Sequence, residues 1–213
     1  MDPLSVVIFV AILLFSIILH EVAHGLMAEK LGDPTARFMG RLTLNPISHI
    51  DPVGSILVPL ILLLPTIVSG TPPKFLFGWA KPVPVDYRNI RDVRKGLILI
   101  SIVGPLTNFM LAAIAALVVR YMSNLSDTGL VLLGQVILVN IVLSVFNMIP
   151  IPPLDGSKVL AGILGYINRD WMHTFLELER YGFILVIVMI MTGVSGMILR
   201  PAVEFMYKIL LGS

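Results

Sequence analysis

The sequence predicts an α-helical polytopic membrane protein with about four to six membrane segments. Of its 213 residues, 57% are hydrophobic and only 13% are charged, and the mean hydropathy is +0.95. Soluble globular chains are much less apolar. Several apolar runs are long enough to cross a bilayer, and the longest mainly polar stretch, residues 70–95, is too short for a soluble domain. We therefore expect residues 1–213 to form a single transmembrane domain in contact with the lipid bilayer.

Composition excludes several classes of protein. The chain has no cysteine, so it has neither a disulfide scaffold nor a cysteine zinc site. The formal charge of +2 is small, and we expect no nucleic-acid partner. Residues 1–5 contain no lysine or arginine, and cleavage after residue 19 would separate the apolar run from the histidines that follow it. We therefore expect a retained transmembrane helix and not a signal peptide.

Residues 4–31 are predicted to form the first helix, which Gly32-Asp33-Pro34 ends. Its second half contains His20-Glu21-Val22-Ala23-His24. Histidines four residues apart lie on one face of a helix, where both rings can reach one cation, and Glu21 can take a proton from a water held there. A helix carrying two ordinary histidines is the simpler reading. Three ionisable groups in an apolar helix are costly, however, and this favours a functional site.

Residues 36–51 follow, and within them residues 41–44 alternate polar and apolar side chains. This pattern predicts a short membrane-associated β-strand or hairpin, although an irregular loop fits equally well. We expect His49 to be a loop histidine and not a metal ligand.

Residues 53–69 are apolar but short and contain Pro59 and Pro65. If this stretch dips into the membrane and returns, eleven of the lysine and arginine residues outside the apolar segments lie on one side and three on the other. If it crosses, they divide eight to six. The positive-inside rule favours a re-entrant segment, with the N-terminus outside and the end of the first helix in the cytoplasm.

The next stretch, residues 78–85, is rich in proline and is predicted to be an extended edge segment. A helix over residues 96–121 places Gly104 and Asn108 on one face, which suits close packing and a functional contact equally. Another helix begins near residue 129 and carries Gln135 and Asn140 among apolar residues.

A second unusual stretch, residues 147–156, has three prolines in four positions followed by Asp155. These prolines break the helix at membrane depth, and an acidic residue at such a break has a cation as its obvious partner. Beyond it we expect an interfacial helix over residues 166–181, a last span over residues 183–199 and a short amphipathic tail in which Glu204 pairs with Lys208.

Catalytic zinc usually has three protein ligands and one open position for water. His20, His24 and Asp155 would together supply two nitrogens and a carboxylate, which predicts one hydrolytic zinc site below the membrane surface.

The sequence resembles the site-2 protease family of intramembrane zinc metalloproteases, in a compact form without PDZ or CBS domains. The resemblance rests on the motif from His20 to His24, on Gly104 and Asn108 in the position of the family's G-x-x-x-N, and on residues 147–156 as its N-x-x-P-x-P-x-L-D-G. It implies that His20, His24 and Asp155 bind zinc and that Glu21 is the general base and then the acid. It also implies that Asn147 holds substrate or the oxyanion; we assign Asn108 to the same group.

The function predicted from this resemblance is hydrolysis of a peptide bond in or near a transmembrane segment of a membrane-protein substrate, at a site open to the cytoplasm of a prokaryotic cell. A divalent-metal transporter is the strongest alternative, because intramembrane histidine and aspartate at a broken helix also suit ion passage. A catalytically silent chaperone or regulator is a third. The sequence indicates neither the substrate nor the oligomeric state.

Overall fold

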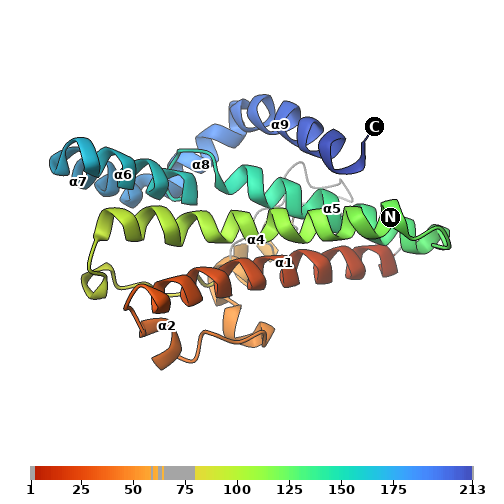
Figure 1. Cartoon of the computed structure of the whole chain (residues 1–213), viewed down its shortest axis with the longest axis horizontal. Helices are drawn as coiled ribbons and strands as arrows, with labels where there is room; N and C mark the ends of the chain where they lie inside the picture. Colours follow the sequence, from red (N-terminus) through yellow and green to blue (C-terminus); the bar gives the residue numbers. More distant parts are fainter. Residues whose placement is uncertain (1–2, 59, 62–63, 65–79, 213) are drawn as a thin grey trace.

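Three long helices form the centre of the molecule (Figure 1). The structure is a computed structural model that describes residues 3–58, 60, 61, 64 and 80–212. Helices α1 (Pro3–Lys30) and α5 (Asp127–Asn147) run in one direction, and α4 (Val93–Tyr121) runs between them in the other. Each is long and apolar enough to cross a membrane. A bent pair near the C-terminus adds a fourth candidate span within the described residues.

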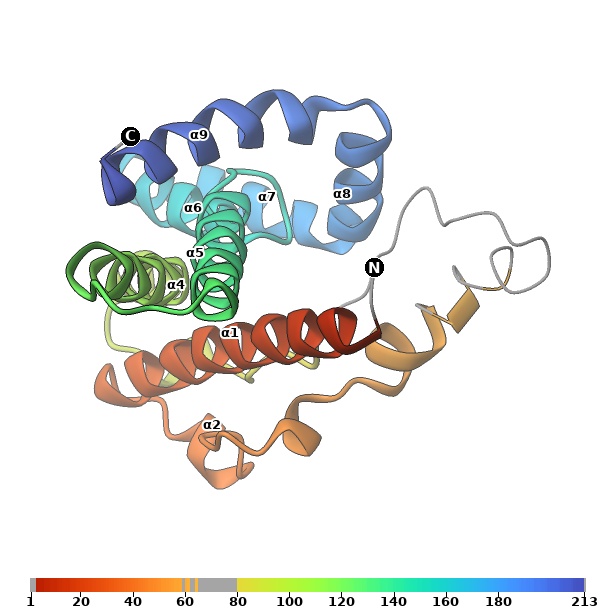
Figure 2. The ribbon, with the colours of Figure 1, turned by 90° about the vertical axis from the view of Figure 1, so that its right-hand side faces the viewer.

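The described part of the chain between α1 and α4 lies beside α1, on the side away from α9 (Figures 1 and 2). It contains α2 (Thr35–Phe38) and the short helical turns η1 (Pro46–His49), η2 (Pro52–Leu57) and η3 (Tyr87–Asn89). Eight of the seventeen residues of the predicted re-entrant segment, residues 53–69, fall outside the described residues. The end of α1 and the start of α4 lie at the same end of the molecule (Figure 1).

The strand predicted over residues 41–44 does not form. The backbone groups there bond locally instead: the Arg41 amide donates to the Ala36 carbonyl at 2.9 Å, and the Asn45 amide donates to the Thr43 hydroxyl at 3.1 Å. His49 is fully buried and its Nε2 lies 2.9 Å from the Thr43 carbonyl. Because side chains satisfy the backbone here, alternation of polar and apolar residues does not produce a ladder.

Residues 80–86 form no helix or strand and are fixed to the neighbourhood of α1 by side chains of the preceding loop. The Arg41 guanidinium donates to the Lys81 and Pro82 carbonyls at 2.8 and 3.1 Å, and the Lys81 amide donates to the His49 carbonyl at 2.9 Å. The Asp33 carboxylate accepts from the Asp86 amide at 2.7 Å. Burial alone would raise the pKa of Asp33, but hydrogen bonds from Thr35, Asn89 and Asp86 more than offset it, so the pKa lies below its ordinary value.

The C-terminal half begins with α6 (Asp155–Ile167) and α7 (Arg169–Glu177), continues through η4 (Leu178–Tyr181) and α8 (Gly182–Met191), and ends with α9 (Val194–Leu211). The last span predicted over residues 183–199 is therefore not one continuous helix: α8 and α9 meet at a bend of 75°, and this bent pair is the fourth candidate span. Gly193 sits at this bend with φ of +76°, a conformation that suits glycine. Helix α9 then crosses over α5 on the side away from α1 (Figure 2). The predicted ion pair between Glu204 and Lys208 is wrong, because Glu204 pairs with Arg200 instead, at 3.2 Å.

Small residues let the central helices approach closely. Ala112 and Ala116 of α4 pack with Ile137 and Ile141 of α5 in a cluster that α9 covers. An added Cβ at Gly162 of α6 would lie 2.8 Å from the Arg94 carbonyl oxygen of α4. In lipid, where apolar burial between helices gains little, such close backbone packing holds helices together. It fixes α1, α5 and α6 around α4.

Candidate metal centre

Three ligand atoms from two helices meet at one point. The Nε2 atoms of His20 and His24 lie 2.9 Å apart, and Oδ2 of Asp155 lies 3.0 and 3.3 Å from them. Both histidines are buried, and Asp155 is nearly so. The structure thus brings together all three ligands predicted from the sequence.

Hydrogen bonds behind the rings set which nitrogen of each histidine carries a proton. Nδ1 of His24 lies 2.6 Å from the Ile100 carbonyl oxygen, which can only accept, so this nitrogen must donate. Nδ1 of His20 lies 2.6 Å from Oδ1 of Asn108, whose Nδ2 donates to the Ser16 carbonyl and to Asn140. Because Oδ1 of Asn108 is therefore the acceptor, Nδ1 of His20 must donate as well. In the neutral rings both Nε2 atoms therefore present lone pairs to the shared point.

The shared point fits a divalent cation. Two imidazole lone pairs and a carboxylate are all acceptors and repel one another unless a positive charge lies between them. Oδ2 of Asp155 is buried and has no hydrogen-bond partner in the described part of the chain. Tetrahedral zinc with bonds of about 2.0–2.1 Å has ligand atoms roughly 3.3 Å apart, close to the spacing found here.

Glycine on α4 leaves room for the two rings. A Cβ added at Gly104 would lie 2.6 Å from Cε1 of His24 and 2.7 Å from Cε1 of His20. One helical turn on, Asn108 is fully buried behind His20 and lines neither cavity of the site. The G-x-x-x-N spacing therefore places both residues against the histidines. Gly104 leaves room for the two rings, and Asn108 accepts a hydrogen bond from His20. The structure thus places the Asn108 amide behind His20, one of the three residues of the candidate metal site.

Asp155 is the first residue of α6, after a compact turn that ends α5 at Asn147. Gly156 packs against the backbone of that turn: an added Cβ would lie 2.5 Å from the carbonyl carbon of Met148 and 2.7 Å from the Ile149 oxygen. The Ser157 hydroxyl donates to the Leu154 carbonyl at 2.7 Å. Backbone packing thus holds this ligand in place.

Two cavities meet at the ligands. One, of about 290 Å³, is lined by polar groups that include His24, Tyr87 and Asp155. The other, of about 640 Å³, is a mainly apolar cleft whose wall includes Ile17 and Phe183. Both are lined by one shared set of residues: His20, Glu21, Pro82, Asn147, Pro153 and Lys158.

Glu21 and Asn147 both line the two cavities beside the ligand group, whereas His49 lies outside the ligand group. Oε2 of Glu21 accepts a hydrogen bond from the Val83 amide at 2.7 Å. Lys158 pairs with Glu179 at 3.1 Å at the cleft. Sequence reasoning did not identify Val83 or Lys158: a backbone amide leaves no residue signature, and Lys158 is set aside as part of an apolar run.

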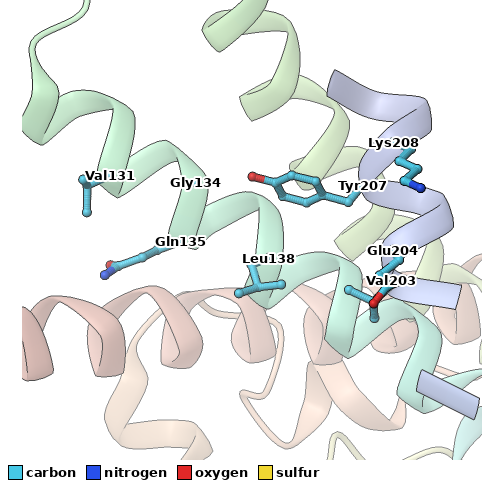
Figure 3. A pocket seen from close by; sticks show the side chains of 8 residues that line it. All are labelled: Val131, Gly134, Gln135, Leu138, Val203, Glu204, Tyr207 and Lys208. Atoms are coloured by element: carbon cyan, nitrogen blue, oxygen red, sulfur yellow. The ribbon is translucent and has the colours of Figure 1, made fainter. Parts of the chain in front are cut away.

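A separate groove of about 570 Å³ lies between α5 and α9 and is close in volume to the larger cavity of the site (Figure 3). Its lining includes Gln135, Tyr207 and Lys208 but no residue of the ligand group. Its surface is mostly apolar, with Val131, Leu138 and Val203 among its walls.

Comparisons with known proteins agree with the geometry. The family model "Peptidase family M50" matches residues 127–192. A Bacillus subtilis protein described as "Putative zinc metalloprotease" is 38% identical over 93% of this chain and 87% of its own length. A Mycolicibacterium smegmatis protein under the same description is 27% identical over 89% of this chain and 70% of its own.

A zinc metalloprotease of Methanocaldococcus jannaschii is 27% identical over 87% of this chain, which spans 43% of that protein. No solved structure matches the chain. These relatives are peptidases, and none is described as a transporter. The chain is a zinc metalloprotease and belongs to peptidase family M50, the site-2 protease family.

Proposed function

We propose that this metalloprotease cleaves a peptide bond within or beside a transmembrane segment of a membrane-protein substrate. In this proposal His20, His24 and Asp155 hold one zinc ion, and residues 1–213 act as one domain in a prokaryotic plasma membrane. The observation that carries it is the convergence of three acceptor atoms inside a bundle of helices long and apolar enough to span a bilayer.

The depth of the ligands supports an intramembrane reaction. His20 and His24 are ten and six residues before Lys30, the last residue of α1. At 1.5 Å per residue they lie roughly 15 and 9 Å from that helix end, within the hydrocarbon thickness. The mainly apolar cleft that reaches them between α1 and α8 suits the side chains of a membrane segment.

Two observations support an active site that opens to the cytoplasm. Most lysine and arginine residues lie in the loop after α1 or near α7, and the positive-inside rule places such segments in the cytoplasm. The end of α1 and the start of α4 lie at one end of the molecule (Figure 1), as expected if the chain between them does not cross the membrane. The N-terminus is then outside.

The chemistry follows from the residues at the junction of the two cavities. Zinc at such a site polarises the scissile carbonyl and lowers the pKa of a bound water to about 7. Glu21 takes the proton of the attacking water and later delivers it to the leaving nitrogen. The Asn147 amide holds the substrate beside the scissile bond. The hydrogen bonds of Asn108 and the Ile100 carbonyl keep the lone pairs of His20 and His24 aimed at the ion.

A helical substrate must unwind before its carbonyl can be attacked, and a neighbouring extended backbone can bond the freed groups. Within residues 81–85, the backbone from Val83 to Val85 suits this role, because Val83 and Val85 line the polar cavity and Arg41 binds only the Lys81 and Pro82 carbonyls of this stretch. Residues 41–44, where the sequence predicts a strand, line neither cavity of the site.

Two measurements on the protein purified in detergent test the proposal: metal analysis, and cleavage of a panel of single-span substrates. Wild type should hold one zinc per chain and cleave at least one substrate. Glu21→Gln should keep the zinc and lose cleavage by about 1,000-fold or more, because removal of the base leaves the ligands intact. Asp155→Ala should lose zinc and activity together. Cleavage that persists in Glu21→Gln would overturn the assignment of the base.

A further inference from the structure

The general base proposed above is held by a backbone amide from a distant part of the chain. The Val83 amide donates to Oε2 of Glu21 at 2.7 Å, across 62 positions of sequence. The other carboxylate oxygen, Oε1, makes no hydrogen bond within the described part of the chain. Glu21 also lines both cavities beside His20. One oxygen is thus engaged, and the other remains available to the site.

The donor itself is firmly placed. Residues 80–86 are fixed on one side of Val83 by Arg41 and the His49 carbonyl, and on the other by Asp33. The Val83 side chain is 7% exposed and packs on α1. These contacts, none of which involves Glu21, fix the position of the Val83 amide.

Gly25, one turn beyond Glu21, permits this approach. A Cβ there would lie 2.8 Å from Cγ1 of Val83 and 2.6 Å from Cδ2 of Leu42. Any larger residue would displace the side chains of Leu42 and Val83, which now pack against Gly25. The motif histidines therefore share their helix with a glycine that lets the Val83 amide reach the carboxylate.

We propose that the Val83 peptide N–H is a positioning group that orients Glu21 for proton transfer, an inference that rests on the proposed role of Glu21. A glutamate side chain has several rotatable bonds, and only some of its rotamers direct an oxygen to the reacting water. A charge-assisted hydrogen bond to Oε2 selects among them and leaves Oε1 facing the cavity. Residues 80–86 then form part of the catalytic support, in addition to any pairing with substrate.

The same contact has an opposite interpretation, in which residues 80–86 block the path of the substrate and their hydrogen bond keeps Glu21 from acting as the base. The two interpretations predict opposite signs when the N–H is removed. Loss of a positioning group slows the reaction, whereas loss of a contact that blocks the substrate speeds it. Activity measurements therefore separate them.

Val83→Pro removes the N–H and keeps a side chain of similar size. Val83 already lies between Pro82 and Pro84, and a residue before proline favours extended backbone close to the conformation that proline adopts. Val83→Ala is the matched control, because it shortens the side chain and keeps the N–H. Replacement of Val83 by its α-hydroxy acid, which puts an ester oxygen in place of the N–H, is the second variant if the proline form is not recovered folded.

With a cleavable single-span substrate, Val83→Pro and the ester form should lower kcat by about 10- to 100-fold. KM should change by less than about threefold, because the amide acts on the base and not on substrate binding. Zinc content should equal that of wild type, and Val83→Ala, which keeps the N–H, should retain a kcat at least about threefold higher than that of either N–H-free form.

Equal kcat in the N–H-free variants and in Val83→Ala would overturn the inference, and so would a rise in kcat. Loss of zinc along with activity would also overturn it, because the contact would then support the fold. If Glu21→Gln remains active, the proposed role of Glu21 as general base fails, and this inference fails with it. If Glu21→Gln is inactive and the N–H-free variants are normal, only this inference fails.

Discussion

His20 and His24 stand on an uninterrupted helix, whereas Asp155 follows a turn with three prolines in four positions. The spacing of the histidines is set by the helix itself, but the aim of their rings depends on Asn108, the Ile100 carbonyl and the space at Gly104. All of these are provided by α4. The histidine half of the site is therefore oriented by a neighbouring helix.

The aspartate half depends on its own stretch of chain. Gly156 rests on the backbone at Met148 and Ile149, and the turn brings Asp155 under the rings. A bulkier side chain at Gly156 would move a main-chain segment, whereas a bulkier side chain at Gly104 would move only the histidine rings. The two halves should therefore differ in how much a single added methyl group disturbs them.

Gly156→Ala should have the largest effect. The added Cβ would lie 2.5 Å from the Met148 carbonyl carbon, and main-chain atoms cannot rotate away from it as a side chain can. We expect loss of nearly all zinc and cleavage, with destabilisation of about 3 kcal/mol or more. Metal analysis and thermal unfolding in detergent measure both effects.

Gly134→Ala on α5 is the matched control, because its added Cβ has no neighbour within 4 Å. It should be neutral or stabilising by about 0.5–1 kcal/mol, since alanine favours helix. A Gly156→Ala protein with wild-type zinc content would show that the turn is not what places Asp155.

Gly104→Ala should have the next largest effect. The methyl group would contact ring atoms of both histidines, so the rings must tilt and their Nε2 atoms must separate from the shared point. We expect zinc affinity to fall by about 100-fold, with the helices intact because side chains absorb the change. Competition with a metal chelator measures the affinity, and circular dichroism checks the fold. If zinc is weakened no more than in Gly134→Ala, the rings do not need this space.

The ligands were predictable because each depends on local sequence. Helical periodicity places His20 and His24 on one face, and prolines before an acidic residue mark Asp155 as a functional candidate. The bounds of α1, α4 and α5 were also close to prediction, since long apolar runs have few alternatives in lipid.

Other features depend on partners that the local sequence does not reveal. The predicted strand at residues 41–44 is absent because side chains such as His49 bond its backbone. The bend between α8 and α9 lies at Gly193, although Pro201 is the stronger helix breaker by residue type. Asn108 was assigned to substrate from its motif, and only the packing of α4 on α1 shows its bond to His20. Val83 acts through a backbone amide that every residue except proline has.

Asn108→Ala tests the histidine half of the site further, and its expected effect on zinc affinity is smaller than that of Gly104→Ala. It removes the acceptor for Nδ1–H of His20 and leaves that donor buried, but it adds no atom that displaces a ring. Loss of such a partner typically weakens metal binding by about 10- to 100-fold. Chelator competition should therefore show a loss no greater than that of Gly104→Ala.

Asn140→Ala serves as the graded control for this prediction. Asn140 bonds Asn108 at 2.9 Å and the Ser16 hydroxyl at 2.9 Å, but it does not touch His20. Its loss leaves Asn108 still bonded to His20 and to the Ser16 carbonyl, so zinc affinity should fall by only about threefold. Equal losses in the two variants would mean that the amides support the packing of the helices and not the orientation of the ring. A larger loss in Asn108→Ala would identify the bond to His20 as the contact through which α4 orients the histidine half of the site.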